Sequence, residues 1–305
     1  MRQMTDVMLG SLELFCLCAE EGSLAAAANK AGLGAPAVSR SLARLEQRLG
    51  VKLIERSTRR MQLTGPGQRY YQQCRQALDV LYSAERDAAG AQQVASGRVR
   101  ISLPTPFAER HVLALLPRFR ESYPQVELEV HLSNRNIDFV ADGFDLAIRM
   151  RNPPVSELIA RHLGNASLLV VAAPTYLQRR GLPAHPDELG LHDCIQFVLP
   201  SSGQPIAWQF LYDGAPLDIE TGGGISVAED LLGCITLAAH GGGLLQTYRF
   251  AVADRLRDGS LVEVLADYSG RVRPVSLMYR KSAHTPLRVR VLIDFLMQNL
   301  RGVLD

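Results

Sequence analysis

The chain has 305 residues, which favours two or three domains, and its 47% hydrophobic content suits folded cores and argues against a disordered protein. Its formal charge of +2 is too small to indicate a partner, and its apolar runs fall short of the roughly 18 residues that a membrane span needs. Acidic residues near the start oppose a signal peptide, and five cysteines without a C-x-x-C pair indicate reduced thiols, so we expect a cytoplasmic protein without a cofactor.

Two short helices are predicted at the start of the chain. Leu12, Phe15 and Cys16 recur at the spacing of one helical face. Ser23 is the expected N-cap of a second helix, which Gly32 ends. Two helices joined by a glycine-containing turn are typical of the helix-turn-helix.

A third helix begins around Pro36, where a missing N–H costs little in the first turn. Val38, Leu42, Leu45 and Leu49 are its predicted buried stripe. The outward residues are then Ser39, Arg40, Ala43, Arg44, Gln47 and Arg48. Three arginines on this face have only Glu46 nearby as a counter-charge.

The charge of the chain is unevenly distributed. Residues 30–60 hold eight basic and two acidic residues, a net of +6, so the rest of the chain carries −4. A basic patch confined to one small segment indicates a surface for a polyanion. The following stretch, VKLIERSTRRMQLTGPG, alternates apolar strands with a basic tip at residues 56–60 and predicts a hairpin wing.

The first 65 residues resemble the winged helix-turn-helix of LysR-type transcriptional regulators, through LFCLCAEEGSLAAAANKAGL and PAVSRSLARLEQRLGVKLIERSTRRMQLTGPG. The sequence departs from the family pattern at Gly34-Ala35, where Ser-Gln is common, and at Ala25, where Thr or Ser is common. Because Ala35 lacks the amide of glutamine, one base contact is expected to be missing.

The resemblance implies that the third helix enters a major groove and that its N-terminal half reaches base edges. Ala35, Pro36 and Ser39 are the predicted base contacts, and Arg40 is expected to reach a guanine edge or a phosphate. Phosphate contacts are predicted for Arg44, Arg56, Thr58, Arg59 and Arg60. The alternative is an ordinary solvated helix face.

Residues 66–97 read as a long helix and a hinge. Tyr71, Cys74, Leu78 and Leu81 form an apolar seam at roughly heptad spacing. The family resemblance implies a linker helix that dimerises through this seam, and the alternative is a helix packed on its own domain.

Residues 98–305 alternate strands such as VELEVHL with helices such as LRVRVLIDFLMQNL, which predicts α/β units around mostly parallel sheets. The region resembles the LysR effector-binding domain, a two-lobed fold similar to periplasmic binding proteins. Lobe I is expected at about 98–165 and 268–305, and lobe II at about 166–267. Together with STRRMQLTGPGQRYY, the segment GFDLAIRM favours the CrgA-like subgroup.

An effector pocket is expected where loops at the strand ends meet between the lobes. The predicted lining residues are Thr105, Phe107, Ser133, Asn134 and Arg149 from one side and Phe197, Glu229 and Gln246 from the other. Arg149 suits an anion or an internal carboxylate, and polar residues at strand ends often only cap the next helix.

Three other functions are weighed against this one. The HGGG segment at 240–243 resembles a lipase oxyanion motif, but no G-x-S-x-G elbow accompanies it, so a helix-to-strand turn is favoured and no enzyme is expected. Cys194 and Cys234 suggest a redox switch, although their surroundings read as core. The scattered histidines predict no metal site. A solute-binding protein of the same two-lobe fold is the remaining alternative.

The sequence therefore predicts a bacterial transcription regulator with an N-terminal winged helix-turn-helix at 1–65, a linker at 66–97 and a two-lobed effector domain at 98–305. Its expected partners are double-stranded DNA carrying an interrupted palindrome, a small-molecule effector and its own copies in a dimer or tetramer. RNA polymerase is a further candidate partner, and no membrane is expected.

Overall fold

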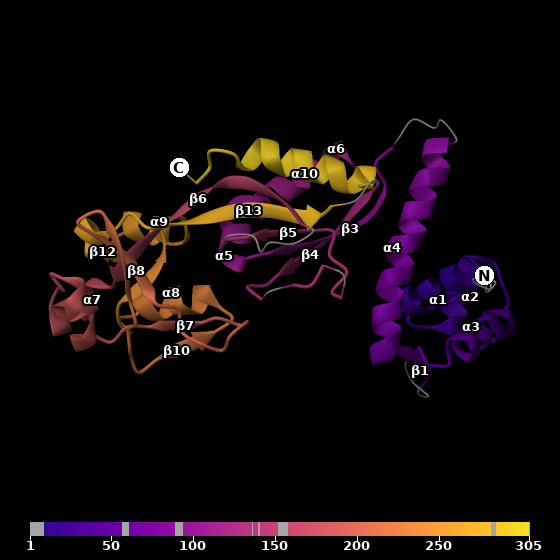
Figure 1. Ribbon diagram of the computed structural model, residues 1–305, viewed down its shortest axis with the longest axis horizontal. Helices are drawn as coiled ribbons and strands as arrows, with labels where there is room; N and C mark the ends of the chain where they lie inside the picture. The colour runs from indigo at the N-terminus through magenta and orange to yellow at the C-terminus, as the bar shows by residue number, and fades with distance from the viewer. Residues whose placement is uncertain are drawn as a thin grey trace. The chain divides into compact units, whose positions relative to one another are not determined.

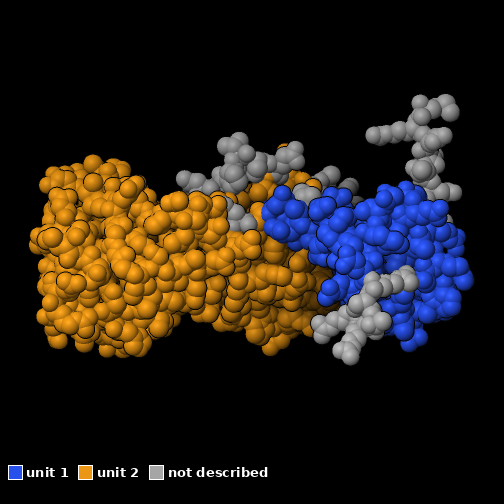
Figure 2. Space-filling model, turned by 90° about the horizontal axis from the view of Figure 1, so that it is seen from below, with its two compact units in different colours: residues 1–93, 138–143 blue, residues 94–137, 144–305 orange. Residues whose placement is uncertain are grey.

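The computed structural model describes residues 9–56, 61–88, 94–135, 137–139, 141–151, 158–281 and 285–304. The chain forms two compact units, one of residues 1–93 and 138–143 and one of residues 94–137 and 144–305 (Figure 2). Within the described residues, every helix is too short or too polar to span a bilayer.

The first unit is a three-helix core with a two-stranded wing and a long helix (Figure 1). Its elements are α1 (Leu9–Glu21), α2 (Leu24–Ala31), α3 (Ala35–Leu49), β1 (Ile54–Arg56), β2 (Met61–Leu63) and α4 (Gly65–Ala88). Strands β1 and β2 pair antiparallel, with Arg56 opposite Met61. The predicted helix-turn-helix and wing are therefore present.

The predicted helix caps are confirmed. The Ser23 hydroxyl accepts a hydrogen bond from the Ala26 amide at 3.4 Å, and Gly32 ends α2 in the left-handed region at φ +66°. Pro36 lies in the first turn of α3, behind an N-cap Gly34 that supplies no side-chain bond. Local turn chemistry therefore fixes where these helices begin and end.

Helix α4 packs on its own domain, which corrects the predicted dimer seam. Cys74 and Leu78 are 5% and 1% exposed and belong to the apolar core around Phe15. The Tyr71 hydroxyl donates to Glu20 at 3.1 Å on α1. Heptad spacing predicts a buried helix face but cannot tell whether the same domain or a second copy covers it. Of the four seam residues, Leu81 is half-buried and outside this core.

The junction between the wing and α4 is tightly packed. The Thr64 hydroxyl donates to the Lys52 carbonyl at 2.7 Å and accepts from the Gly67 amide at 2.9 Å. A Cβ at Gly67 would lie 1.9 Å from the Leu53 carbonyl oxygen. Glycine is therefore required at position 67 because the main chain of the wing passes directly over α4.

The second unit has two lobes. Lobe I contains β3 (Gly97–Leu103), α5 (Thr105–Phe107), η1 (Ala108–Val112), η2 (Leu113–Leu115), α6 (Leu116–Ser122), β4 (Val126–Leu132), β5 (Leu146–Arg149) and α10 (Leu287–Leu300). Lobe II contains α7 (Pro174–Arg180), η3 (Pro186–Leu191), β7 (Gln196–Val198), β8 (Trp208–Tyr212), β9 (Ala215–Ile219), β10 (Ser226–Ala228), α8 (Leu231–Ala239), β11 (Leu245–Tyr248), α9 (Arg249–Arg257), β12 (Val262–Val264) and η4 (Ala266–Tyr268). Strands β6 (Leu158–Ala172) and β13 (Val272–Arg280) run between them (Figure 1).

The sheet is mixed, so the expectation of mostly parallel strands is wrong. The strand order is β11-β6-β13-β5-β3-β4, with β12 also paired to β6. Only β3 with β4 and β3 with β5 are parallel in this sheet, whereas β13 runs antiparallel to both β5 and β6. Residues 158–167 of β6 pair with β13, and residues 168–172 pair with β11 and β12. One strand therefore belongs to both lobes.

The helical segment that follows α5 is not one continuous α-helix. A π-turn at 108–112 and a 3₁₀ turn at 113–115 precede α6. Pro117 lies in the first turn of α6 and has no N–H, so it cannot donate the main-chain hydrogen bond that would continue a helix from the preceding residues. The proline therefore ends the irregular turns and starts a new helix.

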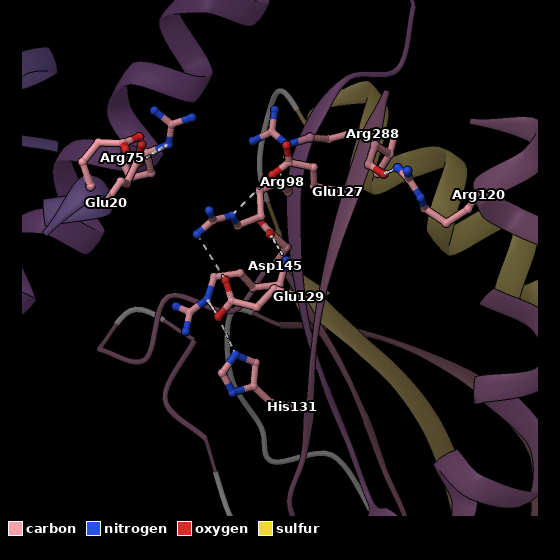
Figure 3. Close-up of polar contacts among 12 residues, drawn as sticks. Glu20, Arg75, Arg98, Arg120, Glu127, Glu129, His131, Asp145 and Arg288 are labelled. Carbon is pink, nitrogen blue, oxygen red and sulfur yellow. Dashed lines mark hydrogen bonds and ion pairs between the residues drawn. The ribbon is translucent and has the colours of Figure 1, made fainter. Parts of the chain in front are cut away.

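Strand β4 forms one end of the sheet and carries a ladder of charges shared with β3 (Figure 3). Arg100 donates to Glu129 at 2.9 Å, and His131 lies 2.6 Å from the same carboxylate. Arg98 contacts Glu129 at 3.4 Å and Glu127 at 3.9 Å. Charged side chains on an edge strand oppose pairing with another sheet.

The Gly67 packing gives a stability prediction. Gly67→Ala should lower the free energy of unfolding by about 1–3 kcal/mol, because the new methyl group forces β1 and α4 apart. Gly65→Ala is the matched control, since the nearest atom to its Cβ is an Arg69 nitrogen 3.9 Å away, and it should change stability by less than about 0.5 kcal/mol. Urea unfolding followed by circular dichroism measures both, and equal midpoints would show that the junction relaxes freely.

Candidate DNA interface and effector pocket

Helix α3 separates a buried face from a basic exposed face. Val38, Leu42 and Leu45 are at most 2% exposed, as the periodicity predicts. Leu49 is 38% exposed, so its assignment to the buried stripe is wrong. The exposed side chains are those of Ala35, Pro36, Arg40, Ala43, Arg44, Gln47 and Arg48, and Ser39 is half-buried. The predicted DNA-contacting residues of α3 therefore share one surface.

Glu46 is buried on α3, although its charge would favour an exposed position. Its carboxylate is 7% exposed and accepts hydrogen bonds from the amides of Leu53 and Ile54 at 3.0 and 3.1 Å. Lys52 donates to its other oxygen at 2.6 Å. The carboxylate faces the wing, so it does not balance the arginines on the outer face of α3.

The environment of Glu46 favours its charged form. Burial alone would raise the pKa of the Glu46 carboxyl. The hydrogen bonds from Lys52 and from the amides of Ile54 and Leu53 outweigh burial and lower that pKa below its ordinary value. An ionised Glu46 therefore fixes the first strand of the wing against α3.

The arginines of α3 differ in what they contact. No ion pair of Arg40 or Arg44 is found within the part of the chain that the structure describes. Arg48, in the last turn, lies near the Tyr70 hydroxyl of α4. Burial raises the pKa of Tyr70 to about 12, and Arg48 opposes that rise. Arg40 and Arg44 are therefore the cations of this helix best placed to meet an anion.

The wing is described only at its base. Arg56 is the last residue of β1, opposite Met61. The predicted phosphate contacts Thr58, Arg59 and Arg60 lie outside the described residues. They remain predictions from the sequence.

The second unit contains a cavity of about 230 Å³ between its lobes. Lobe I, with the linking strand β13, contributes Pro104, Pro106, Asn134, Arg149, Met150, Arg151 and Arg273. Strand β6 and lobe II contribute Leu168, Ile195, Phe197, Leu199, Ser201, Ile206, Trp208, Leu231, Gln246, Thr247 and Tyr248. A concave, largely apolar cavity with a few polar groups is the usual form of a small-molecule site.

Four of the eight predicted effector residues line this cavity. They are Asn134, Arg149, Phe197 and Gln246. The other four, Thr105, Phe107, Ser133 and Glu229, are not among its lining residues. Strand ends predict the neighbourhood of the cavity but not which side chain of each loop faces it.

The four residues outside the cavity have other roles. Phe107 is 1% exposed in the lobe I core and packs against the rings of His111 and Phe250. Ser133 accepts from the Arg135 amide at 3.2 Å in a local turn. Thr105 begins the short α5, between the two lining prolines.

Polar contacts between described residues join the lobes. The Asn134 side-chain amide donates to the Glu229 carbonyl at 2.7 Å, and Glu229 holds a left-handed backbone with φ +68°. Arg110 forms an ion pair with Asp254 at 2.9 Å. The Glu229 prediction therefore identified a residue that contacts the opposite lobe through its main chain.

The amide of Gln246 is engaged by the neighbouring hairpin. Its oxygen accepts from the Gln209 amide at 2.8 Å, and its nitrogen donates to the Gln209 carbonyl at 2.9 Å. This pairing holds β8 against β11, which positions Trp208 at the cavity. Sequence reasoning missed Trp208, although it is the chain's single tryptophan.

The cysteines and the HGGG segment have structural surroundings. Burial raises the pKa of Cys194 and of Cys234 to about 12, and the two thiols lie in different core clusters. Thiols of this kind are inert, which disfavours the redox alternative. His240 to Gly243 form the turn from α8 to β11, and a Cβ at Gly243 would lie 2.2 Å from the Asp193 carbonyl oxygen. No cluster of potential metal ligands occurs among the described residues.

Two protein families match the chain. Residues 9–68 match the bacterial regulatory helix-turn-helix proteins of the lysR family, and residues 92–301 match the LysR substrate binding domain. The chain therefore belongs to the LysR family of transcriptional regulators, with an N-terminal DNA-binding unit and an effector-binding domain. Proteins of this family bind DNA and small-molecule effectors and form oligomers.

Relatives match over nearly the whole length. The probable transcriptional regulator LtrA of Klebsiella pneumoniae is 31% identical over 300 residues, covering 96% of this chain and 95% of that protein. The regulator CrgA of Neisseria meningitidis serogroup C is 31% identical, with 95% and 96% covered, and a CrgA structure has a TM-score of 0.60 at 29% identity, covering 95% and 98%. The full-length Vibrio cholerae virulence activator AphB has a TM-score of 0.61 at 30% identity, covering 96% and 99%. The resemblance to the CrgA-like subgroup is thus confirmed.

The buried carboxylate gives a pH-dependent prediction. Glu46→Gln should lower the free energy of unfolding at pH 7 by about 1–3 kcal/mol, because charge-assisted hydrogen bonds to the wing are weakened. The folded pKa lies below the unfolded value of about 4.3, so this stabilisation is complete above that pH and is lost as pH falls through the folded pKa.

Urea unfolding at several pH values measures this difference. The gap between wild type and Glu46→Gln should narrow as the pH falls below about 4.3. The exposed Glu55 supplies the control Glu55→Gln, for which we expect a change below about 0.5 kcal/mol. A gap that stays constant with pH would show that shape, and not charge, is what the variant disturbs.

Proposed function

We propose that this regulator reads a palindromic DNA site with α3 and the wing, and that a small molecule in the inter-lobe cavity controls that binding. The observation that carries the proposal is the exposed face of α3. It presents Arg40 and Arg44 without carboxylate partners among the described residues, while Glu46 is turned inward.

The residues of α3 divide by their chemistry. Ala35 and Pro36 are exposed at the N-terminal end, where apolar atoms can contact thymine methyl groups. Ser39 is the proposed polar base contact, and Arg40 reaches a guanine edge or a phosphate. Arg44, one turn further on, binds phosphate with the wing residues Arg56, Thr58, Arg59 and Arg60, which positions the helix without reading sequence.

A second copy of the chain completes the DNA-binding unit in this proposal. A groove of about 580 Å³ lies between α1 and α4 and is lined in part by Leu14, Leu17 and Leu33. Leu33 is 46% exposed, and Leu81 is half-buried outside the domain core. The lining mixes leucines with the charged residues Glu13, Glu20 and Arg75. Such a groove beside a long helix suits the amphipathic α4 of a partner copy, and a two-fold dimer would present two recognition helices to the two halves of a palindrome.

The lobes supply the means of control. The cavity walls come from both lobes, and the bond from Asn134 to Glu229 spans them. A ligand that contacts both walls would favour the closed arrangement only if it binds that arrangement better. We propose that this shift alters how the DNA-binding units of an oligomer are spaced. Since its target is chromosomal DNA, the proposed site of action is the bacterial cytoplasm, with RNA polymerase as a further partner.

The DNA interface is tested by the salt dependence of binding. Arg44→Ala should weaken binding to the protein's own upstream intergenic DNA and to random DNA alike, and should reduce the salt slope by about one, because one phosphate contact is lost. Fluorescence anisotropy at several salt concentrations measures the slope. The control Arg301→Ala changes an exposed arginine of the other unit and should leave the slope unchanged. An unchanged slope for Arg44→Ala would place that side chain off the DNA.

Dimerisation is tested at Leu81. Leu81→Asp should convert the protein to monomers and abolish tight palindrome binding, because an unpaired carboxylate in an apolar interface costs several kcal/mol. Gln73→Asp, at an exposed position of the same helix, is the control and should stay oligomeric in analytical ultracentrifugation. A Leu81→Asp variant with the wild-type sedimentation coefficient would remove this residue from the interface.

A further inference from the structure

The inter-lobe cavity contains a buried cation that has no counter-charge among the described residues. Arg149 is 6% exposed. Its terminal nitrogens donate to the Ser102 carbonyl and hydroxyl at 3.2 and 2.7 Å, to the Ile148 carbonyl at 2.7 Å and to the Arg135 carbonyl at 3.1 Å. All of these acceptors are neutral. The alternative raised by the sequence, an internal carboxylate partner for Arg149, is not found among the described residues.

The guanidinium keeps its charge at neutral pH. Burial, with a smaller effect of the nearby Arg151, lowers the pKa of Arg149 to about 10, which still leaves it protonated at pH 7. Buried charges in proteins are normally paired, because removing an ion from water without a partner is costly. A bound anion would supply that partner.

Within the described part of the chain, two buried polar atoms of cavity-lining residues have no hydrogen-bond partner. They are the Nε of Arg149 and the hydroxyl oxygen of Thr247, which is 2% exposed. Both residues line the cavity. Unsatisfied buried polar groups are rare, so these two atoms indicate that a ligand with hydrogen-bonding oxygens completes the site.

The charge of the lining is one-sided. Arg149, Arg151 and Arg273 line the cavity, and none of the lining residues within the described part of the chain is acidic. The rest of the lining is largely apolar and includes Phe197 and Trp208, with the neutral polar side chains of Asn134, Ser201, Gln246 and Thr247 among it. A cationic ligand would be repelled, and inorganic phosphate would leave the apolar part of the wall without a partner.

From this arrangement we propose that the cavity binds a small carboxylate with a flat apolar body, its carboxylate against Arg149 and Thr247 and its body against Trp208 and Phe197. The inference rests on the proposed role of the cavity as the effector site and adds the chemical class of the effector. The volume of about 230 Å³ lies below the roughly 300 Å³ at which ligand pockets usually begin, which favours a ligand about the size of one ring.

The test compares probes of equal shape and different charge. Calorimetric titration of the full chain with benzoate should show binding. Benzamide, which is nearly isosteric and neutral, should bind about tenfold more weakly or worse, because the charge-assisted bonds are lost. Inorganic phosphate should bind more weakly than benzoate, because it cannot use the apolar wall.

Variants assign the contacts. Thr247→Val keeps the shape and removes the hydroxyl, and should weaken benzoate binding by about three- to tenfold. Arg149→Gln should weaken it by at least about tenfold. Arg151→Gln, at an exposed position, tests the charge of the cavity if Arg149→Gln does not fold. It should weaken the binding of benzoate and leave the binding of benzamide unchanged. Thr236→Val, at an exposed position of α8 outside the cavity, is the matched control.

DNA binding by the ligand-free chain is measured in parallel. A failure of the carboxylate assignment can then be distinguished from a failure of the proposed DNA-binding function. Equal affinity for benzoate and benzamide, or unchanged benzoate binding in both Thr247→Val and Arg151→Gln, would overturn the carboxylate assignment while DNA binding and its control by ligands remain. Absence of binding by every probe at millimolar concentration would also overturn it. Loss of the DNA interaction itself would instead contradict the proposed function.

Discussion

The effector domain depends on one strand that belongs to two lobes. Residues 158–167 of β6 pair with β13, with a register shift between Val275 and Ser276, and residues 168–172 pair with β11 and β12, so one strand joins the two cores. The pairing carries β13 with Arg273 and β11 with Thr247 to the cavity. The cavity walls of both lobes are connected through β6 and β13. A change in the bend of these two strands would therefore open or close the cavity while each lobe kept its own core.

Two buried charges in this chain are treated in opposite ways. The Glu46 carboxylate accepts three hydrogen bonds, one of them from a lysine, and its pKa is lowered despite burial. Among the described residues, Arg149 donates to neutral oxygens and its Nε finds no partner. A fully satisfied buried charge is a structural element that fixes the wing on α3. A buried charge with an unsatisfied hydrogen-bond donor indicates a site that a ligand completes.

Turning Glu46 inward also shapes the proposed DNA interface. A carboxylate on the outer face of α3 would repel phosphates and weaken the attraction of Arg40 and Arg44. With Glu46 bound to Lys52 and to the wing main chain, the outer face keeps an uninterrupted positive charge. The same side chain therefore holds the wing in position and leaves the outer face of α3 without an acidic group.

Much of the fold could be predicted from the sequence, because periodicity and caps act over a few residues. Val38, Leu42 and Leu45 are buried at helical spacing, Ser23 and Gly32 bound α2, and VELEVHL is β4 to the residue. The site was only half predictable: strand ends located Asn134, Arg149, Phe197 and Gln246, whereas Trp208 and Thr247 went unnoticed. The tertiary structure alone decided that Leu49 is exposed and Glu46 buried, that Cys74 and Leu78 pack within their own domain, and that β13 runs antiparallel to β5 and β6. Each of these outcomes depends on contacts between segments distant in the chain, and a local pattern gives the buried face of an element without naming what covers it.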